Sequence, residues 1–474
     1  MIEGTAWDRG LSVGAGGKGM VGHAGAVLLR RLADRTGLVI ALTRVFPAGG
    51  SGWRDRAVVF VQLAISIALG ARSVLEAEQL SLHQRRVFGP VVSDSTMHRM
   101  LAAFDEDMFA ALSRARARAR RVVWTLLTLR PNGFPWMSVA GKRLDKWVIV
   151  DVDATIITSA SKKDGAGATF KKTYGFHPLA VWCANTGECL AMMLRSGNAG
   201  SNTAEDHIAV LDEALRQIPG SSSAKLLVRV DGAGATHKLH EYLRDLTTRR
   251  RRVRFTTGWT ITDADEAAIA RLPERAWEPA LQQDGSPHEE YEVAELTGLN
   301  EREGWIDGLR LIVRRVRPSR RHLKNLTDLE KKTGWKYSVV ATDISKMTRI
   351  PGSHQIQWLD ALHRQHAVVE DRVRTGKATG LHNLPSKSWT INRSWMAAAN
   401  TAADLDAWLR LLTLHDQDDL AEAEPQTMRL RIYHQPARLA RHARRRYLRL
   451  DPSWPWTDAF VLAWNRLTAL PQTT

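Results

Sequence analysis

Apolar residues recur at spacings of three and four along residues 26–46 and 57–80, and this pattern predicts amphipathic helices. A shorter helix is expected after Ser93, because Ser93 or Asp94 can cap its first turn. This helix is either the second helix of a helix-turn-helix or an ordinary capped helix. We therefore expect a glycine-rich, disordered segment over residues 1–20 and a helical region over residues 21–144.

The pattern changes over residues 145–257, where short β-rich runs follow one another closely. Strands are expected at 147–153, 177–183 and 188–194, then a helix at 203–217, a strand at 225–231, a helix at 235–246 and a strand at 251–257. Three strands followed by alternating helices and strands are typical of a ribonuclease H-like α/β core.

Residues 258–336 break this rhythm with alternating strand-like runs, and we interpret them as a β-rich insertion. A last core strand is expected at 337–343, within a second part of the core over residues 337–420. Residues 421–474 are expected to form a basic helical tail, with a basic helix at 436–450. The predicted fold is thus α/β: a ribonuclease H-like core interrupted by an insertion, with helical regions at both ends.

The formal net charge of +17 favours a polyanionic partner, most often nucleic acid and less often an acidic membrane. The longest apolar stretch, 57–69, is too short to span a bilayer and contains Gln62 and Ser66. Cys183 and Cys189 alone are too few for a zinc site. We expect a reduced, cytoplasmic protein.

Acidic residues stand at the ends of two predicted strands. Asp151 and Asp153 share one face of the first strand, since alternate residues point to the same side. Asp231 ends another strand and precedes Gly232 and Gly234. Each aspartate alone also fits a turn or a helix cap. Two acids on one face imply a metal ion, a basic partner or the open end of the strand.

A third acidic residue lies in a predicted helix. His363, His366, Glu370 and Lys377 fall on one helix face, and Arg374 follows Glu370 by one turn. The same pattern fits a solvated face with a Glu–Arg pair, or a zinc site made of two histidines and a glutamate.

Together these motifs resemble bacterial DDE transposases of the insertion sequence 1380 family, within the group related to insertion sequence 4. The resemblance runs from about residue 30 to the C-terminus and rests on D-x-D-x-T at 151–155, on residues 175–182 and 194–206, on VRVDGAG at 228–234 and on 365–395. The group's helix signature is Tyr, two residues, Arg, three residues, Glu, six residues, Lys. Glu370 and Lys377 match it, whereas His363 and His366 replace its Tyr and Arg.

The resemblance implies a catalytic triad of Asp153, Asp231 and Glu370, with Asp151 as the alternative first carboxylate. These residues would hold two Mg²⁺ ions, for which Mn²⁺ can substitute. The expected reaction is cleavage at a transposon end, followed by direct attack of the new 3′-hydroxyl on target DNA.

The helix-face cations Lys377, His363, His366 and Arg374 would contact DNA phosphates. Residues 93–99 are the candidate for recognising terminal inverted repeats, and the basic segments 249–254, 314–324 and 438–449 would bind phosphates. Trp305 is either a residue that stacks on a flipped base or a core tryptophan.

The resemblance implies a nucleoid-associated homodimer or larger assembly on terminal inverted repeats and target DNA. Two other functions fit the same residues: a ribonuclease H-like nuclease that cleaves without joining, and a catalytically inactive DNA-binding protein derived from a transposon.

Overall fold

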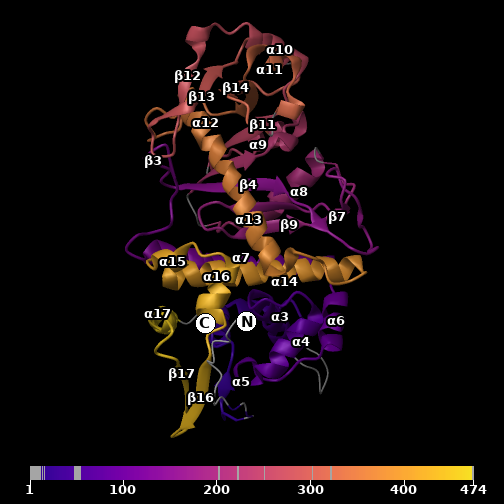
Figure 1. Cartoon of the computed structure of the whole chain (residues 1–474), viewed down its shortest axis with the longest axis vertical. Coiled ribbons are helices and arrows are strands. Elements are labelled where there is room, and N and C mark those ends of the chain that lie inside the picture. The colour runs from indigo at the N-terminus through magenta and orange to yellow at the C-terminus, as the bar shows by residue number, and fades with distance from the viewer. Residues whose placement is uncertain are drawn as a thin grey trace, which may run out of the picture.

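The computed structural model describes residues 12, 14, 16–46, 55–200, 203–220, 224–249, 251–300, 303–320 and 323–471. Most of the predicted disordered segment, residues 1–11, 13 and 15, lies outside the described residues, as do residues 250, 321 and 322 of the predicted basic segments. Figure 1 shows a sheet in the upper part of the molecule, a layer of long helices below it, and the two terminal regions at the lower end.

Helices form the N-terminal region. They are α1 (Ala26–Arg35), α2 (Leu38–Thr43), α3 (Arg56–Ala68), α4 (Val74–His83), α5 (Arg85–Phe88), α6 (Asp94–Ala102) and α7 (Glu106–Leu129). Helix α3 is apolar on nearly all sides and is buried accordingly. The helix expected after Ser93 is α6, and the Ser93 hydroxyl accepts a hydrogen bond from the Thr96 N–H at 3.3 Å. None of the described helices is long and apolar enough to cross a membrane.

A nine-stranded mixed sheet has the strand order β12-β13-β14-β15-β11-β10-β4-β8-β9. Its strands are β4 (Trp147–Ala154), β8 (Leu179–Cys183), β9 (Cys189–Met193), β10 (Lys225–Val230), β11 (Val253–Trp259), β12 (Glu278–Leu281), β13 (Pro287–Glu295), β14 (Arg310–Val316) and β15 (Lys336–Thr342). Strands β4, β10 and β11 are parallel to one another, and each of the other pairings is antiparallel.

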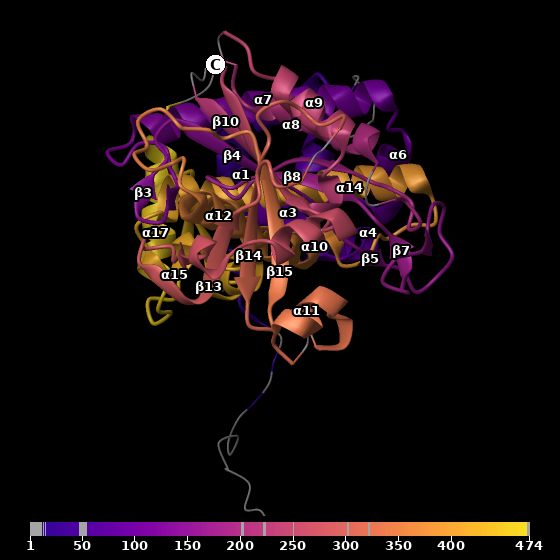
Figure 2. The ribbon, with the colours of Figure 1, turned by 90° about the horizontal axis from the view of Figure 1, so that it is seen from above.

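The two faces of β4 pack against different helices. Its valines contact the cluster that includes helices α8 (Ala204–Gln217) and α9 (His237–Asp245), whereas Trp147 and Ile149 pack with Trp358 of α12 (Ile356–Arg364). Figure 2 shows α8 and α9 on one side of β4 and α12 on the other. Because side chains alternate along a strand, Asp151 and Asp153 lie on the α12 face.

The predicted insertion is not a separate sheet. Strand β15, expected as the last core strand, pairs antiparallel with both β11 and β14, so that Ala341 faces Thr257 on one side and Leu311 on the other. The insertion strands β12–β14 therefore extend the central sheet. The shorter elements of this region are α10 (Asp263–Ala270), η2 (Glu274–Ala276), η3 (Leu323–Asn325) and α11 (Asp328–Thr333).

The helix expected to carry the glutamate motif is a run of several elements. Helix α12 is followed by the 3₁₀ turn η4 (Gln365–Val368), by α13 (Val369–Gly376) and by the π-helical η5 (Lys377–Leu381). The run bends at Thr379 and Gly380, and Gly380 has a φ of 82°. It then joins α14 (Trp389–Leu409), which crosses beneath the sheet in Figure 1.

The basic helix predicted at 436–450 is wrong: these residues form a β-hairpin. Strands β16 (Ala437–His442) and β17 (Arg445–Leu450) pair antiparallel, and β1 (Met20–Val21) pairs with β16. Arginine, alanine and leucine favour helices, but Leu439, Leu448 and Leu450 recur with the period of a strand and pack on the core. Tertiary contacts thus override local propensity.

The remaining elements connect these parts. They are β2 (Ser138–Val139), β3 (Lys142–Arg143), β5 (Ile157–Thr158), β6 (Gly167–Ala168), β7 (Tyr174–Phe176), η1 (Gly232–Gly234), η6 (Arg410–Leu414), α15 (Asp418–Ala421), α16 (Pro425–Met428), η7 (Arg429–Tyr433) and α17 (Thr457–Ala469).

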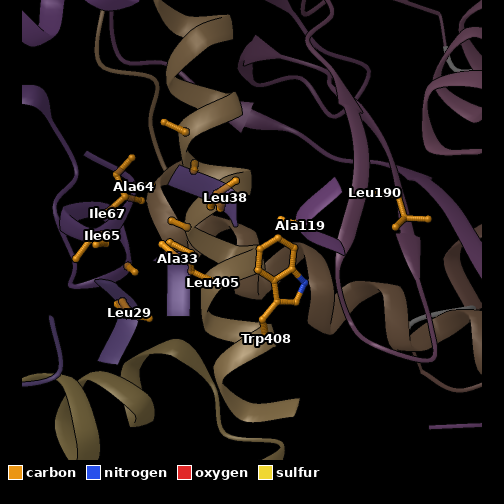
Figure 3. Close-up of a cluster of buried hydrophobic side chains, with 14 of the residues drawn as sticks. Leu29, Ala33, Leu38, Ala64, Ile65, Ile67, Ala119, Leu190, Leu405 and Trp408 are labelled. Carbon is orange, nitrogen blue, oxygen red and sulfur yellow. The ribbon is translucent and has the colours of Figure 1, made fainter. Parts of the chain in front are cut away.

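The main apolar core joins the N-terminal helices to the sheet through α14. Figure 3 shows Leu405 and Trp408 of α14 between Leu29 and Ile67 of the N-terminal helices on one side and Leu190 of β9 on the other. Each of these side chains is fully buried. The N-terminal region and the sheet therefore share one continuous core.

A buried ionic network reinforces the same junction. Arg120 of α7 donates hydrogen bonds to Glu188 at 2.7 Å and to Asp404 of α14 at 2.9 Å. Glu188, in the turn between β8 and β9, also accepts hydrogen bonds from the indole N–H groups of Trp124 at 2.8 Å and Trp408 at 2.6 Å. The charges are buried but satisfied, which is the condition under which buried ions are tolerated.

Candidate active site

Two of the predicted carboxylates stand side by side on neighbouring parallel strands. In the register of β4 and β10, Val152 pairs with Val230, and Asp153 and Asp231 each follow by one residue. Both aspartates are half-buried. Because both follow the same alternation, their side chains point to the face that α12 and α13 cover.

The third carboxylate, Glu370, lies in the first turn of α13. The negative charge of Glu370 contributes to the raised pKa of Asp153. That pKa is about 6, and it is raised mainly by burial, then by the negative charge of Asp231, and to a smaller extent by Glu370. The positive charge of His366 and a hydrogen bond from the Ala154 N–H oppose this rise. The three acids of the predicted triad therefore share one electrostatic environment.

The described carboxylates do not form a compact set of metal ligands. Across the described ranges, no three or more side chains of His, Cys, Asp and Glu lie close enough together to hold a metal ion. Glu370 is exposed and forms no ion pair with a described residue. The donor set is made only of carboxylate oxygens, which suits a hard divalent cation, and a cation would relieve the mutual repulsion of these acids.

Asp151 is engaged elsewhere. It is 3% exposed, and both of its carboxylate oxygens accept hydrogen bonds from Arg229 of β10, at 2.6 Å from Nε and 2.8 Å from Nη2. Arg229 also donates to the Leu362 carbonyl at 3.1 Å, which fixes the end of α12 against the sheet. A bidentate buried pair of this kind leaves Asp153 as the aspartate of β4 with free carboxylate capacity.

The two histidines of the helix motif face the sheet. His366 is 8% exposed, and its Nε2 donates to the Val152 carbonyl at 3.1 Å. Nδ1 of His363 is hydrogen-bonded to the Thr256 hydroxyl at 3.0 Å. The rings lie parallel at 6.1 Å, and burial holds the pKa of His363 well below its usual value. Both rings thus brace the helix run against β4 and β11.

The cations of the motif have different surroundings. Lys377 is half-buried, and its pKa is lowered first by burial and then by the positive charge of Lys171. Arg374 is exposed and pairs with Asp371 and, at 3.4 Å, with Glu424. The charges of Lys377 and Lys171 therefore act on each other, whereas Arg374 is held toward α16 by Glu424.

Two further histidines adjoin Asp231, and no role was assigned to them from the sequence. His177 and His207 are each 2% exposed, and burial lowers the pKa of both, while the negative charge of Asp231 acts in the opposite direction. Arg195 connects their segments, since it donates to the His177 carbonyl at 3.0 Å and to the Thr203 hydroxyl at 3.1 Å. The motifs at 175–182 and 194–206 contain His177 and Arg195, and His207 directly follows the second motif, so these motifs were the available signal.

A close backbone approach sets the position of Asp231. A Cβ atom on Gly258 of β11 would lie 2.5 Å from the Gly232 nitrogen and 3.1 Å from the Asp231 carbonyl carbon. Only glycine fits there without moving the turn that follows β10. By contrast, a Cβ on Gly232 itself would meet nothing closer than 3.9 Å.

Other residues predicted to contact DNA have partners within the protein. Trp305 is half-buried, with its ring 4.0 Å from that of His237 and 4.4 Å from that of Trp259. Arg254 pairs with Asp343 at 3.0 Å, and Arg315 donates to Glu292 at 2.7 Å. The described parts of the segments 249–254 and 314–324 are thus partly neutralised within the protein.

Comparison with known proteins gives a family and a distant structural neighbour. The model of the family described as transposase DDE domain group 1 matches residues 5–472. No curated protein matches the chain. Among solved structures, the chain is similar to the piggyBac transposase in a cryo-EM synaptic complex with hairpin DNA, at 10% identity and a TM-score of 0.43, over 88% of this chain and 81% of that one.

Proposed function

The chain belongs to the transposase DDE domain group 1 family, and we propose that it is the transposase of an insertion sequence of the 1380 family. In this proposal it binds terminal inverted repeats, cleaves the element's ends and joins them to target DNA. The observation that carries the proposal is the position of Asp153 and Asp231 directly after the paired Val152 and Val230 of β4 and β10, with Glu370 of α13 near enough to contribute to the raised pKa of Asp153.

We further propose that the catalytic core is ribonuclease H-like. The strands β9-β8-β4-β10-β11 support this, since the first three are antiparallel neighbours and the last two are parallel to β4. Helices α8 and α9 cover one face, and α12 with α13 cover the other. Residues 258–336 are then an insertion between the fifth strand and the last core helices.

Asp153, Asp231 and Glu370 would hold two divalent cations, with Mg²⁺ as the natural ion and Mn²⁺ as a substitute. Bound there, such ions supply activation of the attacking oxygen and stabilisation of the leaving oxygen of the phosphodiester. The chain's own contribution is to place Asp153 and Asp231 one residue beyond the paired Val152 and Val230, and the Asp153 pKa of about 6 still leaves its carboxylate mostly ionised at neutral pH. The Asp151–Arg229 pair keeps the neighbouring aspartate out of this site.

The surrounding side chains would position DNA. The ammonium group of Lys377 neutralises phosphate charge near the scissile bond, with Lys171 beside it. His366 supports catalysis indirectly, because it holds the helix run to β4 and adds positive charge near Asp153. His363, predicted to contact phosphate, would instead act in the same indirect way through its hydrogen bond to Thr256 of β11, and Arg374 is assigned to the outer contacts of the DNA strand.

The remaining assignments follow from the proposed reaction. Residues 93–99 at the start of α6 would recognise the inverted repeats, with Ser95 and Arg99 exposed there. Two transposon ends need two active sites, so the active species would be a homodimer or a larger assembly on DNA.

The test combines the purified protein, a labelled DNA end with the element's own inverted repeat, a target plasmid and Mg²⁺. Wild type should cleave the end and join it to the plasmid, whereas Glu370→Gln should bind the end and do neither. Asp371→Asn is the matched control, because Asp371 is the adjacent exposed acid on the same helix and pairs with Arg374. It should cleave and join as wild type does.

Other outcomes would point elsewhere. Cleavage without joining would indicate a nuclease of the same core fold. Binding of the end by wild type, without cleavage in Mg²⁺ or Mn²⁺, would indicate an inactive DNA-binding protein derived from a transposon. Equal loss in Glu370→Gln and Asp371→Asn would contradict the assigned role of Glu370.

A further inference from the structure

The hairpin β16–β17 has one face that is apolar toward the core and carries Arg441 and Arg446 toward the tip, and an opposite face that is basic along its length. The register pairs Leu439 with Leu448 and Ala437 with Leu450, and these residues pack on the core. The alternate positions form the opposite face, which consists of Arg438, Ala440, His442, Arg445, Tyr447 and Arg449. The hairpin projects at the lower end of Figure 1, below the layer of helices that separates it from β4.

Like charges face each other across this hairpin. Arg438 pairs with Arg449, Arg441 with Arg446, and His442 with Arg445. Directly opposed like charges destabilise a strand pair, so these arginines do not serve the stability of the hairpin.

Nothing within the described part of the chain neutralises them. All of the hairpin arginines are exposed, and none forms an ion pair with a described residue. Residues 437–450 contain no acidic residue. Arg254 and Arg315 of the other basic segments do have acidic partners. This charge is therefore available to a partner.

The tip of the hairpin is held in an unusual conformation. Ala443 and Arg444 have φ values of 46° and 62°, in the left-handed region that favours glycine. Two successive residues of this kind form the tight turn that matches the twist of a two-residue hairpin. The turn places Arg444, Arg445 and Arg446 at the end of the projection.

A groove of about 740 Å³ continues the basic surface beside β17. Arg30 and Arg86 line it from the N-terminal helices, Arg446 and Arg449 from the hairpin, and Trp464 from α17. The groove thus has arginines on both sides, together with Asp34, and most of its remaining lining is apolar or aromatic.

We propose that the β16–β17 hairpin is an arm that enters the major groove of duplex DNA. The phosphate backbone of that DNA would lie along the protein groove beside β17. The major groove of B-form DNA admits a two-stranded ribbon, and Arg438, Arg449 and Tyr447 are on the face that would meet the bases. The deep, narrow major groove of an RNA duplex does not admit side chains in this way. An acidic membrane would be met by apolar residues, but the leucines of the hairpin face the core.

The arm lies on the far side of the helical layer from β4. The hairpin would therefore bind DNA at a distance from the phosphodiester bond that is cut. Its place in the binding of transposon ends rests on the proposed function, whereas its affinity for duplex DNA does not.

The test uses the full chain and the double variant Arg438→Ala/Arg449→Ala. Affinity for a duplex is measured by fluorescence anisotropy over a range of salt concentrations. The variant should bind on the order of tenfold more weakly. Its salt dependence, the slope of log affinity against log salt, should fall by about 1 for each arginine removed. Protection of guanine N7 from methylation, a major-groove signal, should be lost at one site away from the cleaved end.

Two control variants and a melting temperature distinguish a specific role of the hairpin in DNA binding from a general effect of positive charge and from a loss of folding. Arg438→Lys/Arg449→Lys should retain the salt dependence but lose part of the N7 protection. Arg114→Ala/Arg118→Ala removes two exposed arginines from α7 and should leave the protection unchanged. The melting temperature of the alanine hairpin variant should be equal to or higher than that of wild type, because opposed charges are removed.

The arm is refuted if the alanine hairpin variant keeps wild-type salt dependence and N7 protection, or if the α7 variant loses as much. A lowered melting temperature would indicate a structural role instead. Equal loss of binding to single-stranded DNA, duplex RNA or anionic vesicles would show a general polyanion surface and also overturn the proposal. This experiment measures binding and needs no cleavage. Its result for the hairpin is therefore independent of the Glu370→Gln test: either proposal can be supported while the other is refuted.

Discussion

Asp151 and Arg229 face each other across the parallel strands β4 and β10, with two hydrogen bonds of 2.6 Å and 2.8 Å between carboxylate and guanidinium. Both side chains are almost fully buried. Asp153, two residues further along the same face, has like charges for neighbours instead. Two aspartates of one strand therefore have opposite electrostatic surroundings, and different consequences follow from replacing each.

Replacing Asp151 should damage folding. Asp151→Asn leaves the Arg229 charge buried without compensation, and breaking a buried pair in this way costs about 3–5 kcal/mol. Urea denaturation followed by circular dichroism measures the loss. Asp153→Asn is the matched variant, and it should lose cleavage of a transposon end without losing stability. If Asp153→Asn proved the less stable of the two, the assignment of their roles would be reversed.

The stability of the metal-free protein should depend on pH through Asp153. Its pKa of about 6 in the folded protein exceeds the ordinary 3.8, so folding favours the protonated form. The stabilising contribution is complete below the ordinary value and is lost as pH rises through about 6. Denaturation of wild type and Asp153→Asn at a series of pH values should show the variant gaining relative stability across this window. A constant difference between the two proteins would contradict the coupling.

Gly258 should be required for cleavage although it carries no functional group. In Gly258→Ala the new Cβ would lie 2.5 Å from the Gly232 nitrogen, so the turn that carries Asp231 must move. Small displacements of catalytic groups reduce rates strongly, and we expect roughly a 100-fold loss of cleavage. Gly232→Ala, with no contact under 3.9 Å, should retain activity. Parallel cleavage assays on the two variants make the comparison, and equal activity would remove the packing argument.

The Arg120 network should determine whether the N-terminal helices stay attached to the sheet. Arg120→Leu leaves Glu188 buried without its cation and leaves Asp404 paired with Arg116 alone, and we expect a loss of about 3–5 kcal/mol in the free energy of unfolding. Arg121→Ala, at the exposed neighbouring position, should change stability by less than about 0.5 kcal/mol. Limited proteolysis should then release the helical region in Arg120→Leu alone. Resistance to protease in that variant would show that apolar contacts suffice.

The sequence predicted the strands that carry the site better than it predicted their neighbours. Alternation placed Asp151 and Asp153 on one face, and the structure confirms this through the helices packed on each side of β4. The choice between the two aspartates depended on Arg229, which lies on a strand remote in sequence. The spacing of Arg229 and Asp231 put both on one face of their strand, but it could not show that this strand adjoins β4.

Long-range pairing also explains the remaining differences. The direction of His363 and His366 depends on Thr256 and on the Val152 carbonyl, neither of which is near them in the chain. The hairpin at 437–450 is composed of residues that favour helices, and only its packing on the core and its pairing with Met20–Val21 select strands.

The pairing of β15 limits how the insertion could be replaced by one of another length. Because β15 is paired on both edges, excising residues 258–336 would leave β11 or β15 with an unpaired row of backbone donors and acceptors. Open strand edges of this kind recruit other chains and cause aggregation. An insertion of different length can therefore replace residues 258–336 only if it supplies a strand that pairs with the free edge of β15. A chimaera with a shortened insertion that lacks such a strand should be recovered in inclusion bodies.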